Sequence, residues 1–397
     1  GTSKSAEATS TPLKKFNPIK PYKSSFEMWE LEGSAINLEI GKINFIPFYS
    51  STNLSANLDS TKITSFNESG IHLDESKKDN VNEKIYGAAL HYSFKNNSAG
   101  INYYQIEFDH KFAKPDYHNK YNAFSTCFTL FRSFQPTSIE VAYADNKFAG
   151  IFVTRWGDIE FKQLLLFRYY EKNFPSWHGN PFSSQSNFDN ETGFYYGITL
   201  KPFKNIKINF YFDLWDFPKT RYYEKMPTIG SEQFLQIEFS GNNNRLRLCF
   251  RHKNKEKYIK LQDAEIRDFE RTLVRLDWFQ YLNSLTLKTR CEIVMEYLKN
   301  EKLYDKGILV YEQLKYQIDR LKIIAQLTVY HSDILLYMYE SNINGIMQNS
   351  VFSGDGIYSY LVVKYDITEN FELQFKISDK WNTDNNKRFY FQVLTNF

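Results

Sequence analysis

The amino-acid sequence predicts an all-β fold: an integral outer-membrane antiparallel β-barrel of about twenty strands (roughly 18–22) spanning residues 1–397. Three observations predict it. Apolar and polar side chains alternate along most of the chain, short turns alternate with long polar connections, and the last strand carries an apolar residue at every second position before its end.

The composition fits a membrane protein that crosses the bilayer with strands. Aromatic residues make up 18% of the chain, yet the mean hydropathy is −0.52 and no run of eighteen apolar residues occurs, which excludes a transmembrane helix. A barrel strand turns only every second side chain to lipid, so half of its residues can be polar. Composition alone leaves a soluble β-sandwich or β-helix open, and a net charge of +3 is too small to indicate a nucleic-acid partner.

Period-two alternation is the strongest of the three observations. In residues 206–214, Ile, Ile, Phe, Phe and Leu alternate with Lys, Asn, Tyr and Asp. The stretches 285–296 and 371–377 alternate in the same way. In each stretch one face suits hydrocarbon and the other suits water.

The connections between these strands fall into two kinds. The short, turn-like ones are Gly41–Lys42, Lys95–Ser98, Pro202–Asn205, Gly241–Asn244, Asn283–Ser284, Gln317–Asp319 and Asp366–Asn370. The long, polar ones are about 57–84, 110–120, 171–191, 217–230, 255–268 and 332–356. Because the two kinds alternate, we expect the short turns and the C-terminus to be periplasmic and the long loops extracellular. This division gives nineteen strands from Gly33 onward, and one more near Thr2–Leu13 would make twenty.

The C-terminal strand carries a second, more specific pattern. Its alternate positions share one face and end on an aromatic residue: Phe389, Phe391, Val393, Thr395 and Phe397. A last strand of this kind resembles the signal read by the outer-membrane assembly machinery. Outer-membrane lipid and that machinery are therefore the first partners that we expect.

Six segments carry recognisable strand and loop signatures: Thr2–Ala6, Pro18–Tyr22, Phe45–Ser51, Ser69–His72, Tyr211–Asp213 and Phe217–Tyr222. These segments resemble large Bacteroidota outer-membrane barrels that carry an N-terminal helix-hairpin-helix domain. The resemblance covers most of the chain, but it consists of strand and loop signatures and includes no catalytic motif.

The resemblance implies that 1–397 is the C-terminal barrel part of a longer protein, which would lack upstream strands and the helical domain. A role in handling DNA is implied only through that domain, to which no residue of this chain can be assigned. The family's own function is poorly defined.

No motif predicts catalytic, cofactor-binding or metal-binding residues. The seven histidines (His72, His91, His110, His118, His178, His252 and His331) show neither HExxH spacing nor a neighbouring nucleophile elbow. The three cysteines form no CxxC pattern, and the acidic loops show no EF-hand spacing. We therefore expect no enzyme, although a chance His–Ser or His–Asp pair at one barrel face would make a hydrolase conceivable.

A basic stripe is the one constellation with a possible role in transport. If the apolar residues of three successive strands face lipid, seven cations face the lumen: Arg245, Arg247, Arg251, Arg271, Arg275, Lys288 and Arg290. One interpretation is an anion-attracting wall. The other, which we favour, is a lumenal salt-bridge network in which Glu238, Asp277, Glu292 and Glu296 neutralise the cations.

Three functional hypotheses remain open at this point. The first is a channel or transport-type barrel, for which about twenty strands leave a lumen that must be open or plugged. The second is a structural or scaffolding barrel that docks lipoproteins or other envelope subunits. The third and least favoured is a membrane-embedded hydrolase.

Overall fold

A computed structural model describes residues 7–9, 30–67, 75–132, 135–175, 178–179, 181–184, 189–221, 224–260, 264–299, 304–344, 346, 348–381 and 386–395. Twenty strands form one sheet, and three short strands form a second. The chain divides into two compact units, Gly1–Gly197 with Asp213–Ile229 and Ile198–Phe212 with Gly230–Phe397, which are described separately below. Among the described residues, no helix is both long enough and apolar enough to span a bilayer.

The strands of the first unit begin near the N-terminus and follow one another along the chain. They are β1 (Gly33–Ala35), β2 (Leu38–Ile40), β3 (Ile43–Leu54), β6 (Val81–Phe94), β7 (Asn97–Phe108), β9 (Lys120–Arg132), β10 (Gln135–Ala144), β11 (Lys147–Gly157) and β12 (Phe161–Tyr170). Each pairs antiparallel with the next, except that β1 and β2 both pair with β3, in one continuous register. The pair β1 and β2 therefore acts as a single strand.

Three strands run across the boundary between the two units: β13 (Glu191–Phe203), β14 (Ile206–Phe217) and β15 (Thr228–Ser240). The remaining strands belong to the second unit. They are β16 (Asn244–Lys260), β17 (Ala264–Leu282), β18 (Leu285–Leu298), β19 (Asp305–Ile318), β20 (Leu321–Glu340), β21 (Gln348–Thr368), β22 (Phe371–Trp381) and β23 (Asn386–Thr395). From β15 to β23 each strand pairs antiparallel with the next.

The predicted all-β antiparallel sheet is confirmed together with its count of about twenty strands. From Gly33 onward the strands number nineteen when β1 and β2 count as one. The twentieth strand, expected near Thr2–Leu13, lies mostly outside the described residues. The described part, residues 7–9, is a bend and a turn.

The short connections lie where the sequence predicts them. Gly41, Lys95, Asn283 and Asp319 adopt positive φ at four of them, the left-handed conformation that tight hairpin turns need. Two further short connections were not predicted. Asp145 and Asn146, both with positive φ, join β10 to β11 as in a type I′ turn, and residues 158–160 join β11 to β12.

Alternate side chains on each strand point to opposite faces, and the apolar set is exposed. On β10, Ile139, Val141 and Tyr143 are 43, 40 and 40% exposed, while their neighbours face the other side. In the second unit Phe250, Val274 and Ile293 are exposed at matching positions of β16, β17 and β18. Exposed Phe and Ile on one face of a regular strand would be costly in water, and they match the predicted lipid-facing set.

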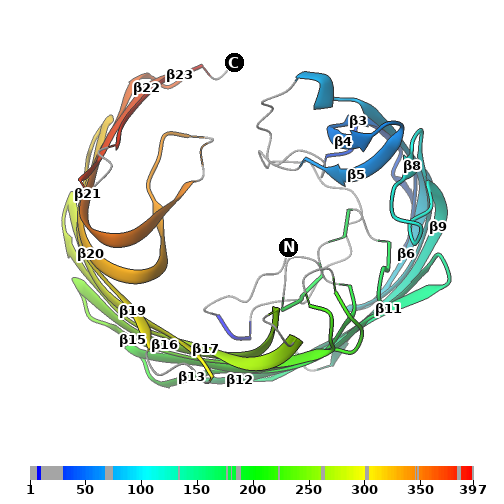
Figure 1. Cartoon of the computed structure of the whole chain (residues 1–397), viewed down its shortest axis with the longest axis horizontal. Helices are drawn as coiled ribbons and strands as arrows, with labels where there is room; N and C mark the ends of the chain where they lie inside the picture. The colour runs from blue at the N-terminus through cyan, green and yellow to red at the C-terminus, as the bar shows by residue number, and fades with distance from the viewer. Residues whose placement is uncertain are drawn as a thin grey trace. The chain divides into compact units, whose positions relative to one another are not determined.

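We call the concave side of each unit its inner face (Figure 1). In the first unit a hairpin of β4 (Ala56–Asp59) and β5 (Lys62–Phe66) lies against this face, and β5 pairs in parallel with β8 (Lys111–Phe112). Ile63 of the hairpin packs with Val81, Ile85 and Ile106 of the wall. Residues 57–84, expected to form one long loop, thus contain two strands and the start of β6.

A second inward fold occurs in the other unit. The pairing of β20 with β21 shifts register between Ser332 and Leu336, and beyond this bulge the two strands turn onto the inner face (Figure 1). There Leu336, Met338 and Phe352 join a buried cluster with Leu309 and Val362 of the wall. We call residues 333–352 the inturned hairpin. Residues 332–356, expected as a loop, are therefore mostly strand.

Candidate functional site

The predicted basic stripe lies on the inner face of β16, β17 and β18 in the second unit. The register pairs Arg247 with Asp277 and Cys249 with Arg275, and Asp277 in turn with Arg290, so these side chains occupy adjacent positions on three neighbouring strands. The structure thus places all seven cations of the stripe on one face. The apolar residues between them, such as Leu248 and Trp278, are exposed on the opposite face.

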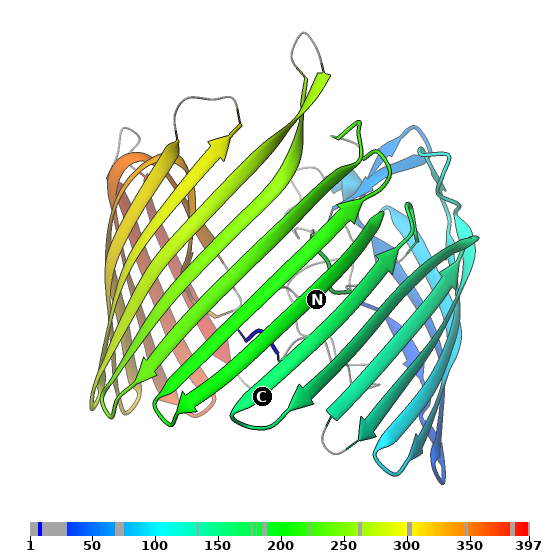
Figure 2. The ribbon, with the colours of Figure 1, turned by 90° about the horizontal axis from the view of Figure 1, so that it is seen from below.

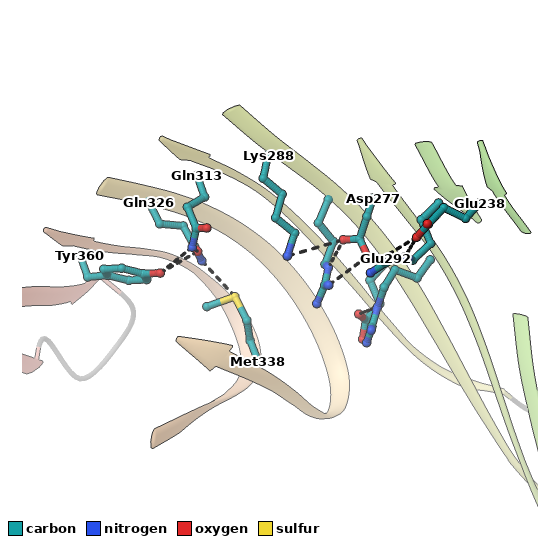
Figure 3. Close-up of polar contacts among 11 residues, drawn as sticks. Glu238, Asp277, Lys288, Glu292, Gln313, Gln326, Met338 and Tyr360 are labelled. Atoms are coloured by element: carbon teal, nitrogen blue, oxygen red, sulfur yellow. Dashed lines mark hydrogen bonds and ion pairs between the residues drawn. The ribbon is translucent and has the colours of Figure 1, made fainter. Parts of the chain in front are cut away.

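Close ion pairs connect most of the stripe to carboxylates on the same face (Figure 3). The N–O distances are 2.8 Å for Arg247–Glu238, 2.5 Å for Arg271–Glu296, 2.6 Å for Arg275–Glu292 and 2.5 Å for Arg290–Asp277. Longer contacts join Lys288 to Asp277 at 3.9 Å and Arg251 to Glu232 at 3.7 Å. The four carboxylates proposed from the sequence all take part in these pairs.

Arg245 lies beside two aromatic rings of β17. Its guanidinium lies 4.4 Å from the ring centroid of Phe279 and 5.9 Å from that of Tyr281. An aromatic face stabilises a cation without neutralising it. Arg245 therefore keeps its full charge on the inner face.

Four further cations continue the stripe and were not recognised in the sequence. Lys253, Lys255 and Lys257 follow at alternate positions of β16, and Arg267 lies opposite Lys257 on β17. Lys255, Lys257 and Arg267 were missed because 255–268 was expected to be a loop, whereas β16 runs on to Lys260. The alternating Lys253-Asn-Lys-Glu-Lys257 pattern was the available signal, since it has the period of a strand.

A hydrogen-bonded group beside the stripe connects the wall to the inturned hairpin (Figure 3). Gln313 donates to Tyr360 Oη at 2.8 Å, and Tyr360 donates to Gln326 at 3.0 Å. Gln326 in turn contacts Met338 Sδ at 3.1 Å. These contacts hold Met338 of the hairpin against the inner faces of β19, β20 and β21.

The far end of the inturned hairpin is held by a buried ion pair. Lys376 Nζ on β22 lies 2.5 Å from Glu340 Oε1, and both side chains are at most 1% exposed. Ser350 donates to Glu340 at 2.7 Å, and Tyr358 also hydrogen-bonds this carboxylate. Beyond the pair, the backbone N–H of Asn344 donates to Gln374 at 2.6 Å, so the hairpin is docked along the wall as far as β22.

The first unit has a different charged cluster, which is entirely buried. Arg168 of β12 binds Glu191 of β13 at 2.5 Å and Asp213 of β14 at 2.7 and 3.2 Å, and all three side chains are 0% exposed. Gly193 makes room for the guanidinium, since a Cβ there would lie 2.3 Å from Arg168 Cζ. The sequence analysis did not find this cluster.

The connection between β12 and β13 folds onto this cluster. Ser183 Oγ and the backbone N–H of Ser184 donate to Glu191, and Tyr170 Oη donates to the carbonyl of Phe182. Further along the same connection, His178 Nε2 lies 2.8 Å from Glu83 Oε2 of β6. The connection therefore spans the inner face of the first unit from β12 to β6.

Histidine–carboxylate pairs occur at three other places in the described part of the chain. His110 contacts Asp109 at 2.6 Å, His118 contacts Asp145 at 2.9 Å, and His331 contacts Asp355. The partner of the histidine is an aspartate in each of the three pairs. Among the described residues no group of His, Cys, Asp and Glu is arranged to hold a metal ion.

The predicted C-terminal signal falls on β23. Phe389, Phe391, Val393 and Thr395 are exposed on one face of this strand, as the alternation requires, and Phe391 is 69% exposed. Phe397 lies outside the described residues.

Compared with models of protein families and with curated protein sequences, the chain matches none of them. Solved structures of outer-membrane proteins do show similarity. A loop-deletion mutant of OmpT, an outer-membrane protein of Vibrio cholerae, is 8% identical over 79% of this chain and 99% of its own, with a TM-score of 0.38. The copper transporter OprC is 10% identical over 85% of this chain and 56% of its own (TM-score 0.40), and OccK5 of Pseudomonas aeruginosa is 9% identical over 80% and 93% (TM-score 0.33). Sequence identities and TM-scores this low do not indicate the role of the chain.

Proposed function

We propose that the protein is an outer-membrane β-barrel that forms a passage for hydrophilic solutes. The observation that carries this proposal is the two-sidedness of the strands. One face exposes Phe, Leu, Ile and Val from β6 to β23, while the other carries ion pairs and hydrogen-bonding side chains. Water beside the charged face would solvate its polar side chains, and lipid beside the other face would solvate its apolar side chains.

In this arrangement the C-terminus and short turns face the periplasm, the long connections face outward, and β23 serves the assembly machinery. The inturned hairpin and the β12–β13 connection would narrow the passage, each within its own unit. We also propose membership of the Bacteroidota family that the sequence resembles. Similar strand and loop signatures support this proposal, and it gives no DNA contact to any residue of this chain.

A planar-bilayer recording tests the channel. Protein purified in detergent and added to a bilayer in 1 M KCl should produce discrete conductance steps. A scaffolding barrel, the second candidate, would insert and remain electrically silent while retaining an envelope lipoprotein on purification. Silence of a correctly folded protein, judged by its heat-modifiable electrophoretic migration, would overturn the channel function.

A further inference from the structure

An excess of positive charge is concentrated on the inner faces of β15 to β18. Their inward positions carry eleven cations: Arg245, Arg247, Arg251, Lys253, Lys255, Lys257, Arg267, Arg271, Arg275, Lys288 and Arg290. They carry six carboxylates: Glu232, Glu238, Glu265, Asp277, Glu292 and Glu296. The excess of five exceeds the +3 of the whole chain, so the rest of the protein is slightly acidic. Salt bridging alone therefore does not neutralise this face.

The cations of β16 form a regular row. Six of its seven inward positions from 245 to 257 are Arg or Lys, interrupted only by Cys249. Successive inward side chains of a strand lie about 7 Å apart, so an anion between two rungs is within reach of both. A row of closely spaced, equivalent sites is the arrangement that lets an ion step along a wall without becoming trapped.

The row continues beyond the part of the wall that suits lipid. On the outward face of β16, Leu246, Leu248 and Phe250 give way to His252, Asn254 and Glu256. β16 and β17 have 17 and 19 residues, whereas about 9–11 suffice to cross a bilayer. Their hairpin extends past the ends of β18 and β19 (Figure 2). Lys253, Lys255 and Lys257 thus lie at the mouth, where a solute first meets the row.

The two parts of the row differ in their partners. Beside the lipid-facing part, Arg247 of the row and Arg275 and Arg290 of the neighbouring strands each pair with a carboxylate at 2.8 Å or less. Arg245, at the other end of the row, stacks on Phe279. At the mouth, the Lys253 ammonium has only a longer contact, 3.9 Å to Glu232, and the Lys257 ammonium lies 3.4 Å from the ring centroid of Phe269, which does not cancel its charge. The mouth would therefore collect anions, and the shared charges deeper in the row would bind them weakly enough for release.

We propose that the inner face of β15 to β18 is a track for small oxyanions, solutes that carry a carboxylate or phosphate group. This inference rests on the channel function proposed above and names its substrate class. Arg and Lys both bind such groups, Arg with two parallel hydrogen bonds and Lys as a point charge.

The test compares two triple variants that remove the same charge. Lys253→Gln/Lys255→Gln/Lys257→Gln removes three lysines of the mouth, and Lys42→Gln/Lys95→Gln/Lys204→Gln removes three exposed lysines of the short connections. Reversal potentials are measured across gradients of KCl, potassium phosphate and potassium acetate. The wild type should prefer each anion over potassium, and the mouth variant should lose about 3–10-fold of that preference in dilute salt. The loss should shrink near 1 M salt, where screening acts within about 3 Å.

The outcomes separate the two proposals. A conducting wild type with no anion preference, or a mouth variant that behaves like the connection variant, overturns the track and leaves the channel standing. If the protein does not conduct, the channel fails, and the track is judged by ³¹P line broadening of inorganic phosphate. If the wild type broadens the phosphate line and the mouth variant does not, the oxyanion site is supported. Equal line widths would overturn it.

Discussion

Two regions of the inner face hold clusters of charge, and they differ in almost every respect. In the first unit, Arg168, Glu191 and Asp213 are fully buried, closely bonded and negative by one formal charge. In the second unit, the basic row is partly exposed and carries more cations than carboxylates. A buried charge must be paired and hydrogen-bonded to be tolerated, whereas a charge beside water can remain without a close partner. Burial thus separates the cluster that holds the structure together from the one that is available to a solute.

The largest effect is expected from breaking the buried cluster. Arg168→Met should destabilise the protein by about 3–5 kcal/mol, because Glu191 and Asp213 would stay buried without their cation. Urea unfolding in lipid vesicles measures the loss, with Arg155→Met on β11 as the matched control. A loss of stability below about 1 kcal/mol, similar to that of the control, would show that water reaches the cluster. The buried cluster and the basic row would then not differ in the way described.

The next effect concerns the buried pair that docks the inturned hairpin. Lys376→Met should cost about 2–3 kcal/mol, less than Arg168→Met because Tyr358 and Ser350 still donate to Glu340. Backbone hydrogen exchange should accelerate in residues 334–344 and stay unchanged in the middle of β18. Unchanged exchange in the hairpin would mean that its apolar contacts alone hold it, and Leu336→Ala would then be the variant that releases it.

A larger side chain at Gly307, beside the bulge of β20, should also loosen the inturned hairpin. Gly307→Ala would place a Cβ 2.2 Å from Ser332 Oγ and 2.9 Å from Leu336 Cδ2. Overpacking of this kind typically costs about 1–3 kcal/mol. Exchange in residues 334–344 should again rise. Gly150→Ala on β11, whose Cβ would meet nothing nearer than 3.7 Å, is the control and should have little effect.

A smaller effect is expected at a half-exposed pair of the basic row. Arg271→Gln removes a salt bridge whose side chains are 33 and 21% exposed. Such pairs contribute about 1 kcal/mol or less, so urea unfolding should change little. A loss as large as that of Arg168→Met would contradict the distinction between the two regions.

The smallest effect is expected in the β10–β11 turn. Burial raises the pKa of Asp145, but hydrogen bonds from His118 and Lys147 outweigh it and hold the pKa below its usual range. The ionised carboxylate therefore adds stability above its ordinary pKa, and this contribution disappears as the pH falls through the lowered pKa. Asp145→Asn should be slightly less stable than the wild type at pH 7 and equal to it near pH 2. A difference that persists in acid would mean that the turn geometry, and not the charge, is responsible.

Period-two alternation predicted which residues share a face, and the structure bears this out from β3 to β23. It placed Asn209, Tyr211 and Asp213 opposite Phe210 and Phe212 because a strand leaves no other choice. Alternation does not reveal where a strand bends, so the inward turn beyond Ser332 was missed. Nor does it reveal which inward charges meet across strands, which is why the cluster around Arg168 went unnoticed.

The proposed barrel requires that alternate side chains of each strand meet lipid and water. Spin labels on single cysteines from Thr137 to Tyr143 of β10, in a background without Cys127, Cys249 and Cys291, test this in reconstituted vesicles. Collision rates with oxygen and with a water-soluble nickel complex should alternate with period two, with oxygen favoured at Ile139, Val141 and Tyr143. Uniform access of the nickel complex to all seven positions would contradict the account.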